Sequence, residues 1–365
     1  MPHYKFDQIA YNITDKKMPE PGDEKTYIGL QHLDSGSLKV TRWGNEVELK
    51  GQKLVMKKGD LLFGRRNTYL RRAAIAPHDG IFSAHGMIFR PKTEVIDPEY
   101  FPFFISSNYF MDAAIRISVG SLSPTVNWKT LKELEFDIPT LEEQKKNAEL
   151  LKAINDTKEA YQELLLKTDD LVKSQFIEMF GDPNEPEHSV PFEQAFIIRD
   201  DLRKPINNTV RAEMHEDAKY PYYGANGQID TINEYLMDCT ALCLAEDGGS
   251  YGPGEKTSYI VHGKCWVNNH AHVLIPRENC NIKYANSFFR ILDMSPYVSG
   301  TTRLKLTQRK MKEIPIVLPD YNLQKEYADF VEQSDKSKFE LEQAIESTDN
   351  LIKSILYSNL EEKKE

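Results

Sequence analysis

The chain has 365 residues, of which 40% are hydrophobic and 28% charged, and its formal net charge at pH 7 is −10. This length allows two or three domains, and the composition is typical of a globular protein without a membrane-spanning segment. Four cysteines in so long a chain exclude a disulfide framework and indicate a reducing compartment, so we expect a cytoplasmic location.

The acidic total does not decide whether the chain binds nucleic acid, because the charge is unevenly distributed. Residues 1–120 contain slightly more Lys and Arg than Asp and Glu, so the remainder carries the net negative charge. A DNA-binding protein needs a local basic surface and not a basic average.

Residues 1–119 are expected to form a first globular domain of mixed α and β structure. Short apolar runs separated by turns predict strands at Leu61–Phe63, Ala73–Ala76 and Gly86–Phe89. The segment between the first two runs is rich in arginine, which binds phosphate or guanine bidentately, and holds an asparagine, which fits adenine. A solvated charged loop is the alternative. The residues predicted to contact DNA here are Arg65, Arg66, Asn67, Tyr69, Arg71 and Arg72.

Residues 120–183 are expected to form a turn, an extended segment and one long helix. No Gly or Pro interrupts the chain from Glu142 to Phe180, and Gly181 and Pro183 mark the end of the helix. About 40 residues at 1.5 Å each give a rod of roughly 60 Å. The spacing of its apolar residues is typical of a coiled coil. It predicts a seam through Leu150, Ile154, Tyr161, Leu164 and Leu171.

An internal repeat predicts a second long helix. The sequence from Gly120 to Phe176 aligns without a gap on the sequence from Gly300 to Leu356. Two unrelated amphipathic helices are the alternative, which the ungapped identities disfavour. We therefore expect the two helices to pair antiparallel, related by a pseudo-twofold axis. Identical pairs include Pro139 with Pro319, Gln144 with Gln324, and Leu171 with Leu351.

Residues 184–299 are expected to form a second globular domain, with Ala241–Leu244 at the position that corresponds to Leu61–Phe63. Tyr220–Gly227 is predicted to be an aromatic turn. Its residues Tyr222, Tyr223 and Asn226 are predicted to contact DNA, although the two tyrosines could equally be core residues. Residues 300–365 repeat the first spacer region. Their first turn adds Arg303 and Lys305, for which phosphate is the expected partner.

No complete catalytic or metal-binding motif is recognised. Gly249–Thr257 is similar to a phosphate-binding loop, but Glu255 separates the last glycine from the lysine, so a flexible loop is predicted. We expect no catalytic residue in this chain, and no metal or cofactor bound by it. The spacing of the candidate zinc ligands fits no zinc motif, and these residues are interpreted as core residues: Cys239, Cys243, Cys265, His262, His270 and His272.

Two variable domains, each followed by a related long helix, resemble the specificity (S) subunit of type I restriction-modification systems. The resemblance covers essentially the whole chain. It is carried by the helix starts at Ile138–Pro139 with Gln144 and Leu318–Pro319 with Gln324, by the helix end at Lys173–Pro183, and by Tyr220–Gly227 with Glu246–Gly248.

The resemblance implies an α+β fold with two mixed α/β target-recognition domains, at residues 1–119 and 184–299. They are separated by two long antiparallel coiled-coil helices in the spacer regions 120–183 and 300–365, which hold them at a fixed distance. Each domain is implied to read one half of a bipartite double-stranded DNA sequence. The chain itself is then non-catalytic. Its implied partners are two methylation (M) subunits and the restriction (R) subunits, which bring S-adenosylmethionine, ATP and Mg.

Two other functional classes stay open. A stand-alone DNA-modifying enzyme with an unrecognised motif would show cofactor-dependent activity without partners. A coiled-coil adaptor that binds only protein would show no affinity for DNA. We also expect the acidic side chains of the first long helix, with Leu165, Leu166 and Val172 beside them, to dock the methylation subunits.

Overall fold

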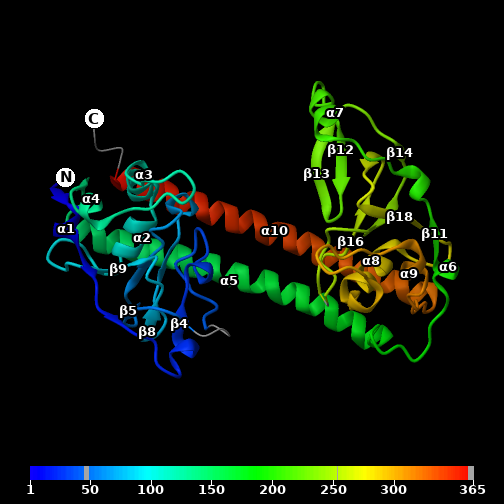
Figure 1. Cartoon of the computed structure of the whole chain (residues 1–365), viewed down its shortest axis with the longest axis horizontal. Helices are drawn as coiled ribbons and strands as arrows, with labels where there is room; N and C mark the ends of the chain where they lie inside the picture. Colours follow the sequence, from blue (N-terminus) through cyan, green and yellow to red (C-terminus); the bar gives the residue numbers. More distant parts are fainter. Residues whose placement is uncertain (45–48, 253, 361–365) are drawn as a thin grey trace. The chain divides into compact units, whose positions relative to one another are not determined.

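The computed structural model describes residues 1–44, 49–252 and 254–360. Its contacts divide the chain into two compact units. Unit 1 comprises residues 1–162 together with residues from 343 onward, and unit 2 comprises residues 163–342. Each unit therefore contains one globular domain and a portion of each long helix (Figure 1).

Within its described residues, unit 1 contains two four-stranded sheets and one short two-stranded sheet. The first sheet has the order β2-β9-β6-β7 and is antiparallel throughout, and the second has the order β3-β5-β8-β4, with β4 parallel to β8. The strands predicted near residues 61, 73 and 86 are confirmed as β6, β7 and β9. The strands are β1 (His3–Lys5), β2 (Ala10–Ile13), β3 (Lys16–Lys17), β4 (Tyr27–Ile28), β5 (Lys53–Met56), β6 (Leu61–Phe63), β7 (Ala73–Ile75), β8 (Gly80–Phe82), β9 (Met87–Pro91) and β10 (Glu135–Asp137).

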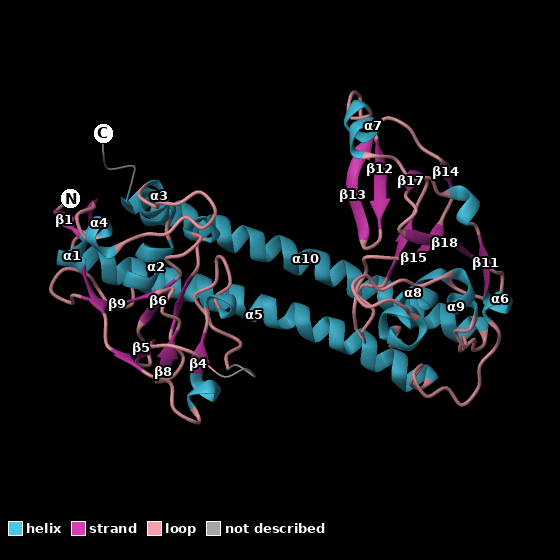
Figure 2. Cartoon of the chain, in the orientation of Figure 1, coloured by secondary structure: helices cyan, strands magenta, loops and turns pink. Residues whose placement is uncertain are grey.

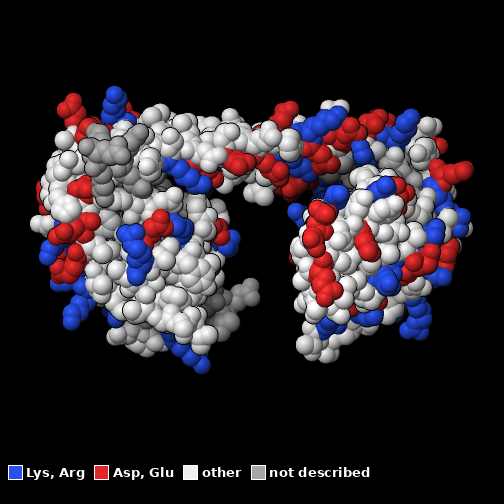
Figure 3. Space-filling model, turned by 90° about the horizontal axis from the view of Figure 1, so that it is seen from above, with Lys and Arg blue, Asp and Glu red and all other residues white. Residues whose placement is uncertain are grey.

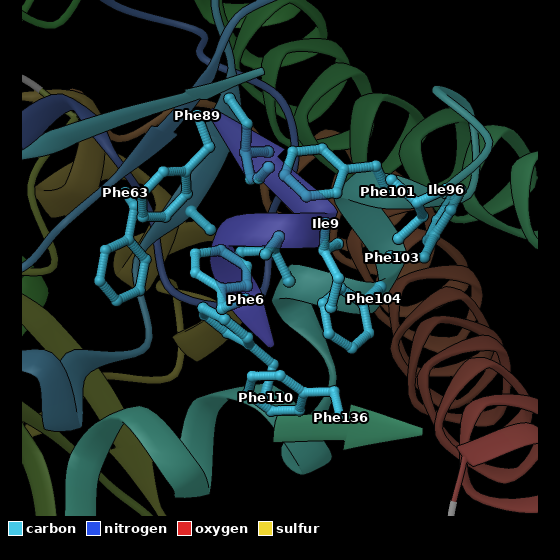
Figure 4. Packing of buried hydrophobic residues seen from close by; sticks show 14 of the residues in the cluster. Phe6, Ile9, Phe63, Phe89, Ile96, Phe101, Phe103, Phe104, Phe110 and Phe136 are labelled. Carbon is cyan, nitrogen blue, oxygen red and sulfur yellow. The ribbon is translucent and has the colours of Figure 1, made fainter. Parts of the chain in front are cut away.

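Phenylalanine rings fill the core of unit 1. The ring of Phe6 lies centrally among its neighbours, with its centroid 5.2 Å from that of Phe89 and 5.0 Å from that of Phe110 (Figure 4). Each such fully buried side chain contributes about 1.5–3 kcal/mol to folding. Residues of both long helices belong to the same core, namely Ala148, Leu151, Leu356 and Leu360. The helices of the domain are α1 (Phe6–Ile9), α2 (Phe101–Ser106), α3 (Asn108–Arg116) and α4 (Trp128–Leu131).

The described part of unit 2 also contains two four-stranded sheets, whose strands are magenta in Figure 2. Their orders are β11-β18-β15-β16 and β13-β12-β17-β14. The strands are β11 (Phe196–Ile198), β12 (Tyr220–Gly224), β13 (Gly227–Ile232), β14 (Met237–Asp238), β15 (Ala241–Ala245), β16 (Ser258–Val261), β17 (Lys264–Val267) and β18 (Ala271–Pro276). The helices of the domain are α6 (Phe192–Ala195), α7 (Asn208–Glu213), α8 (Ile282–Ile291) and α9 (Gln308–Lys312).

The sheets show that the two domains are diverged copies of one fold. The order β2-β9-β6-β7 repeats as β11-β18-β15-β16, which confirms that β15 corresponds to β6. In the second sheet of each unit, one strand has a parallel neighbour and an antiparallel neighbour: β8 lies between β4 and β5, and β17 between β12 and β14. The copies differ in the added strand, which is β3 on β5 in unit 1 and β13 on β12 in unit 2. The unit 2 sheet thereby gains a β-hairpin.

The two long helices, α5 (Leu141–Phe180) and α10 (Tyr321–Leu360), pair within each unit. In unit 1, Nζ of Lys158 lies 2.7 Å from Oδ1 of Asp349. In unit 2, the hydroxyl of Tyr327 donates to the carbonyl of Val172 at 3.2 Å. The first part of α5 therefore meets the last part of α10, and the reverse holds in unit 2, so the helices run antiparallel as predicted. Among the described residues, no helix is long and apolar enough to cross a membrane.

A buried glutamine joins each domain to the first turn of its long helix. In unit 1, Oε1 of Gln144 accepts the N–H of Asp97 at 2.7 Å, and Nε2 donates to the carbonyls of Val95 and Pro139 at 3.0 and 2.7 Å. We call this arrangement the glutamine clasp. In unit 2, Gln324 makes the matching bonds to Asn281, Asn279 and Pro319 at 2.8, 3.0 and 2.8 Å.

The predicted seam of α5 is wrong at its three leucines, whereas Ile154 and Tyr161 are half-buried. Leu150, Leu164 and Leu171 are 50%, 48% and 52% exposed, whereas the adjacent Leu151 is fully buried in the core of unit 1. Likewise, Val172 packs on the core of unit 2. The physical reason is that adjacent apolar residues of α5, such as Leu150 with Leu151 and Leu171 with Val172, lie on two different faces of the helix, and either face could form the seam. The helix buries the face that contacts the globular domain as well as the other helix.

Replacing Gln144 by Ala is expected to lower the free energy of unfolding. The change removes the partner of the buried Pro139 carbonyl, at about 1–3 kcal/mol, and of two part-buried backbone groups, at less than that for each. Gln324→Ala should act in the same way in unit 2. Denaturant titration of the full chain measures the effect, with the exposed neighbour Lys145→Ala as control. An unfolding midpoint for Gln144→Ala equal to that of the control would show that the clasp does not stabilise the unit.

Two adjacent leucines of α5 should respond in opposite ways to a charge. Leu151→Asp places a carboxylate in the core of unit 1 and is expected to cost more than about 4 kcal/mol or to prevent folding. Leu150→Asp places the same carboxylate in solvent and should leave the thermal unfolding temperature nearly unchanged. Equal destabilisation by both substitutions would show that Leu150 is buried in the seam, as the sequence predicted.

Candidate nucleic-acid interface

The arginine-rich loop joins β6 to β7 and is closed at its base, where the N–H of Gly64 donates to the carbonyl of Arg72 at 2.9 Å. Asn67 and Arg71 flank a 3-10 turn over Thr68–Leu70 and have left-handed backbone conformations, with φ of 54° and 49°. Residues other than glycine rarely adopt this conformation, and where they do the surrounding structure fixes them. These two conformations and the hydrogen bond at the base define the course of the loop backbone.

The side chains of this loop differ in availability. Arg71 forms an ion pair with Asp112, so its charge is already neutralised. Arg66 and Tyr69 are exposed, and Arg72 is half-buried. Within the described residues, neither Arg66 nor Arg72 has an acidic partner, so both charges are available to an anion.

A turn from the spacer region packs directly on the arginine-rich loop. Val119 and Thr125 close this turn, because the N–H of each donates to the carbonyl of the other at 3.1 and 2.9 Å. The N–H of Asn67 donates to the carbonyl of Pro124 at 2.7 Å. Nε of Arg65 and Oδ1 of Asn67 are buried without a hydrogen-bond partner. Residues 65–72 and 119–125 thus form one surface, which we call the first contact surface.

In unit 2, the predicted aromatic turn is instead the end of a β-hairpin. β12 ends at Gly224 and β13 begins at Gly227, with Ala225 and Asn226 at the tip. Asn226 is exposed, and its Nδ2 donates to the carbonyl of Gly248 at 3.5 Å. This bond links the hairpin tip to the loop after β15.

The core alternative holds for one tyrosine of the hairpin. Tyr222 is 2% exposed and packs with Ile232 and Trp266, so it is removed from the predicted DNA contacts. Side chains alternate across a strand, and Tyr222 points to the buried side. Tyr223 is half-buried, and its ring stacks on that of Tyr259 at a centroid distance of 5.5 Å. It offers at most one edge to a ligand.

The predicted cations of unit 2 lie on a turn with the same backbone as that in unit 1. The N–H groups of Ser299 and Lys305 donate to each other's carbonyls at 3.0 and 2.8 Å. Both cations have acidic partners, since Nη2 of Arg303 lies 2.8 Å from Oδ1 of Asp247 and Nζ of Lys305 lies 2.8 Å from Oε1 of Glu246. We call residues 225–226, 246–248 and 299–305 the second contact surface. A phosphate must compete with these carboxylates for the cations.

A buried ion network supports the second contact surface. Arg203 pairs with Glu246 and with Asp200, the latter at 3.0 Å, and Nδ1 of His272 lies 2.8 Å from Oδ2 of Asp200. Burial raises the pKa of the Asp200 carboxyl, but its hydrogen bonds with His272, Gln308 and the backbone of Val273 outweigh burial, so the pKa is below its ordinary value. For Glu246, burial is likewise outweighed by Lys305 and Arg203, and the pKa is lowered.

The same cluster has the donor types of a metal site, because ligand atoms of Asp200, Glu246 and His272 all lie within 4.8 Å of one another. The guanidinium of Arg203 already supplies the cation to both carboxylates. A metal ion would have to displace it. The arrangement is therefore an ion network that fixes the loop after β15.

The core interpretation of the other candidate metal ligands is only partly right. His262 is exposed, and His270 is half-buried and pairs with Asp247, so neither is a core residue. Cys243 and Cys265 lie in an apolar core, and burial raises the pKa of the Cys265 thiol to about 11. The segment Gly249–Thr257, whose Pro253 is outside the described residues, leads into strand β16. A phosphate-binding loop instead leads into a helix N-terminus.

The two contact surfaces share a backbone plan and differ in charge. An isolated bridge joins Arg66 to Thr125 in unit 1, and a matching bridge joins Asp247 to Lys305 in unit 2. Acidic and basic side chains are mixed on the face of each unit drawn in Figure 3.

Sequence reasoning missed three features of these surfaces. It did not assign the pairing of Asp247 with Arg303, the half-buried Arg203, or the exposed Leu122. The repeat contained a usable signal, because it places Glu246–Gly248 opposite the arginine-rich loop. Acids at that position, followed by cations in the next turn, favour ion pairing.

Solved structures of related systems share the fold. A chain from a study of complex assembly and conformational transition of the type I R-M system aligns with a TM-score of 0.55 at 15% identity, over 97% of this chain and 96% of that chain. The S subunit of a type I restriction-modification system from M. genitalium aligns with a TM-score of 0.55 at 14% identity, over 97% and 95%. At these identities, the likeness shows the fold alone.

Two curated relatives match by sequence. A Haemophilus influenzae protein named as a type I restriction enzyme specificity subunit is 30% identical over 151 residues, which are 41% of this chain and 38% of that protein. The type I restriction enzyme EcoDI specificity subunit of Escherichia coli is 25% identical over 142 residues, or 38% and 31% of the two chains. The matched segments thus span well under half the length of either relative.

The family model gives the widest sequence match. The type I restriction modification DNA specificity domain matches residues 14–166 and 203–348, which together are more than half of the chain. Each match covers one globular domain and part of its long helix, as the internal repeat requires. The chain therefore belongs to the type I restriction modification DNA specificity domain family.

Proposed function

We propose that this chain is the DNA-recognition subunit of a type I restriction-modification complex, and that its two domains read the two halves of a bipartite double-stranded target. Family membership supports a role in DNA target specificity. The observation that carries the bipartite proposal is the duplicated contact surface. In each unit the same turn packs on the loop that follows the corresponding strand, β6 or β15, but the side chains differ. Base identity is read by side chains, so equal scaffolds with different side chains suit different half-sites.

The two surfaces are proposed to hold DNA in different ways. In unit 1, Arg66 and Arg72 bind phosphate or guanine, and Tyr69 packs on the sugar-phosphate backbone. In unit 2, the exposed Asn226 pairs with adenine. Arg303 and Lys305 contact phosphate after exchanging their carboxylate partners. This exchange makes DNA binding by unit 2 depend on a close fit, because each ion pair with a carboxylate must break before the contact with phosphate forms.

The catalytic steps are proposed to belong to partner subunits. Methylation subunits would carry S-adenosylmethionine, and restriction subunits would carry ATP and Mg. Each unit offers an exposed leucine at the same place in the repeat, Leu351 in unit 1 and Leu171 in unit 2, at 49% and 52% exposure. Leu150 of unit 1 and Leu164 of unit 2 are also exposed. These apolar side chains support one methylation subunit on each unit.

The first test is genetic. Single-molecule sequencing of host DNA should reveal a bipartite methylated sequence that disappears when this gene is deleted and returns when the gene is restored. A methylation pattern that survives the deletion unchanged would argue against the proposed function. Cofactor-dependent activity of the purified chain alone would instead support a stand-alone enzyme.

Two single substitutions should change non-specific DNA affinity in opposite directions. Arg66→Ala removes a phosphate contact and should lower the slope of log affinity against log salt by about one. Asp247→Asn releases Arg303 to phosphate and should raise both the affinity and the slope. Filter binding of the full chain to a random duplex measures both values. Glu178→Gln, which removes the same charge from an exposed position on α5, is the control.

These outcomes separate the contact surfaces from a general charge effect. If Asp247→Asn and Glu178→Gln raise the affinity equally, the carboxylate acts through net charge and does not shield Arg303. If Arg66→Ala leaves the slope unchanged, the first contact surface does not bind the DNA backbone.

The proposal that two methylation subunits bind each chain is tested by the mass of the complex. Native mass spectrometry of the active complex should give two methylation subunits for each copy of this chain, since each unit offers one apolar site. Leu171→Asp should remove one of the two without unfolding the chain, because Leu171 is exposed. A single methylation subunit in the active unmodified complex would refute the duplicated dock.

A further inference from the structure

An exposed leucine stands at the tip of the first contact surface. Leu122 is 95% exposed, the highest value for a large hydrophobic side chain among the described residues. Single exposed apolar residues are ordinary on protein surfaces, so exposure alone assigns no role. The turn that carries Leu122 and the groups beside it supply the further observations.

The turn holds Leu122 in a fixed position. Besides the paired hydrogen bonds that close it, Gly120 has φ of 109°, a conformation that residues with side chains rarely adopt. The bond from Asn67 to Pro124 ties the turn to the arginine-rich loop at 2.7 Å. Little backbone freedom is lost when such a tip meets a ligand, so its contacts are favourable.

The neighbours of Leu122 suit a nucleic acid. Arg66 comes from the adjacent loop, and its Nη2 lies 3.4 Å from Oγ of Ser123, the residue after Leu122. Arg66 has no acidic partner within the described residues, so a cation open to phosphate stands beside an exposed apolar tip. Proteins that unstack DNA combine these two elements, with a leucine or similar side chain inserted between base pairs and cations on the flanking backbone.

The corresponding turn of unit 2 lacks this combination. Its backbone is the same, with φ of 110° at Gly300, but Thr302 occupies the tip. Arg303 and Lys305 follow, where unit 1 has Ser123 and Thr125. One scaffold therefore presents an apolar tip in unit 1 and a polar, cationic turn in unit 2.

We propose that Leu122 inserts between two neighbouring base pairs of the half-site bound by unit 1 and partly unstacks them. This inference rests on the proposed function. The cost of unstacking depends on sequence and is lowest at pyrimidine–purine steps. Leu122 thus selects a flexible step in the first half-site without a hydrogen bond to either base. The Thr302 turn binds without unstacking, so the distortion is confined to one half of the target.

The test uses the full-length chain and a duplex that carries the methylated bipartite sequence found by sequencing. 2-Aminopurine is substituted at successive positions, and its fluorescence rises on unstacking. No methylation subunit is present, so no enzyme flips a base. The wild-type chain should raise the fluorescence at one step in the half bound by unit 1 and at none in the other half. Leu122→Thr, which gives unit 1 the tip residue of unit 2, should bind but lose the rise. Thr302→Leu should leave the unit 1 rise unchanged.

The possible failures are distinguishable. Leu122 is exposed, so Leu122→Thr is not expected to affect folding. No rise with the bound wild-type chain, or an equal rise with Leu122→Thr, overturns the insertion and leaves the proposed function standing. If the wild-type chain does not prefer this duplex to a scrambled one, the proposed function fails and the insertion fails with it.

Discussion

The buried glutamine at the start of each long helix is the interaction on which each unit depends. One amide group offers both two donors and an acceptor, so Gln144 satisfies an N–H and two carbonyls at once. A glutamate could accept but not donate, and a lysine could donate but not accept. The domain and the first turn of the helix cannot move apart without leaving these buried groups unpaired. The contact surface of each unit is therefore fixed relative to the helix that leaves it.

The duplicated turn has the same backbone in both units but different side chains at its tip. Its backbone bonds are the same in both units, so residues at the tip and in the adjacent loop change without altering the fold. Unit 1 has an apolar tip and Arg66 without an acidic partner. Unit 2 pairs Arg303 with Asp247 at 2.8 Å. Such pairing weakens non-specific attraction to phosphate, which is a source of specificity as well as a cost in affinity.

Much of the fold could be predicted because it is encoded locally or twice. The ungapped repeat predicted the second helix and the antiparallel pair, and apolar runs predicted β6, β7 and β9. The register of α5 could not be predicted, because Leu150 and Leu151 are chemically equivalent until the globular domain is in place. The position of Tyr222 required the hairpin partner strand. Arg303 and Asp247 are 56 residues apart, so only the tertiary fold brings them together.

The central claim is that each unit reads its own half of one bipartite target. The most direct measurement is single-molecule mapping of methylated sites in hosts whose only copy of this chain carries either Arg66→Ala or Asn226→Ala. The account predicts that Arg66→Ala relaxes or changes only one half of the methylated sequence and that Asn226→Ala changes only the other half. A change in both halves from either substitution, or in the same half from both, would contradict it.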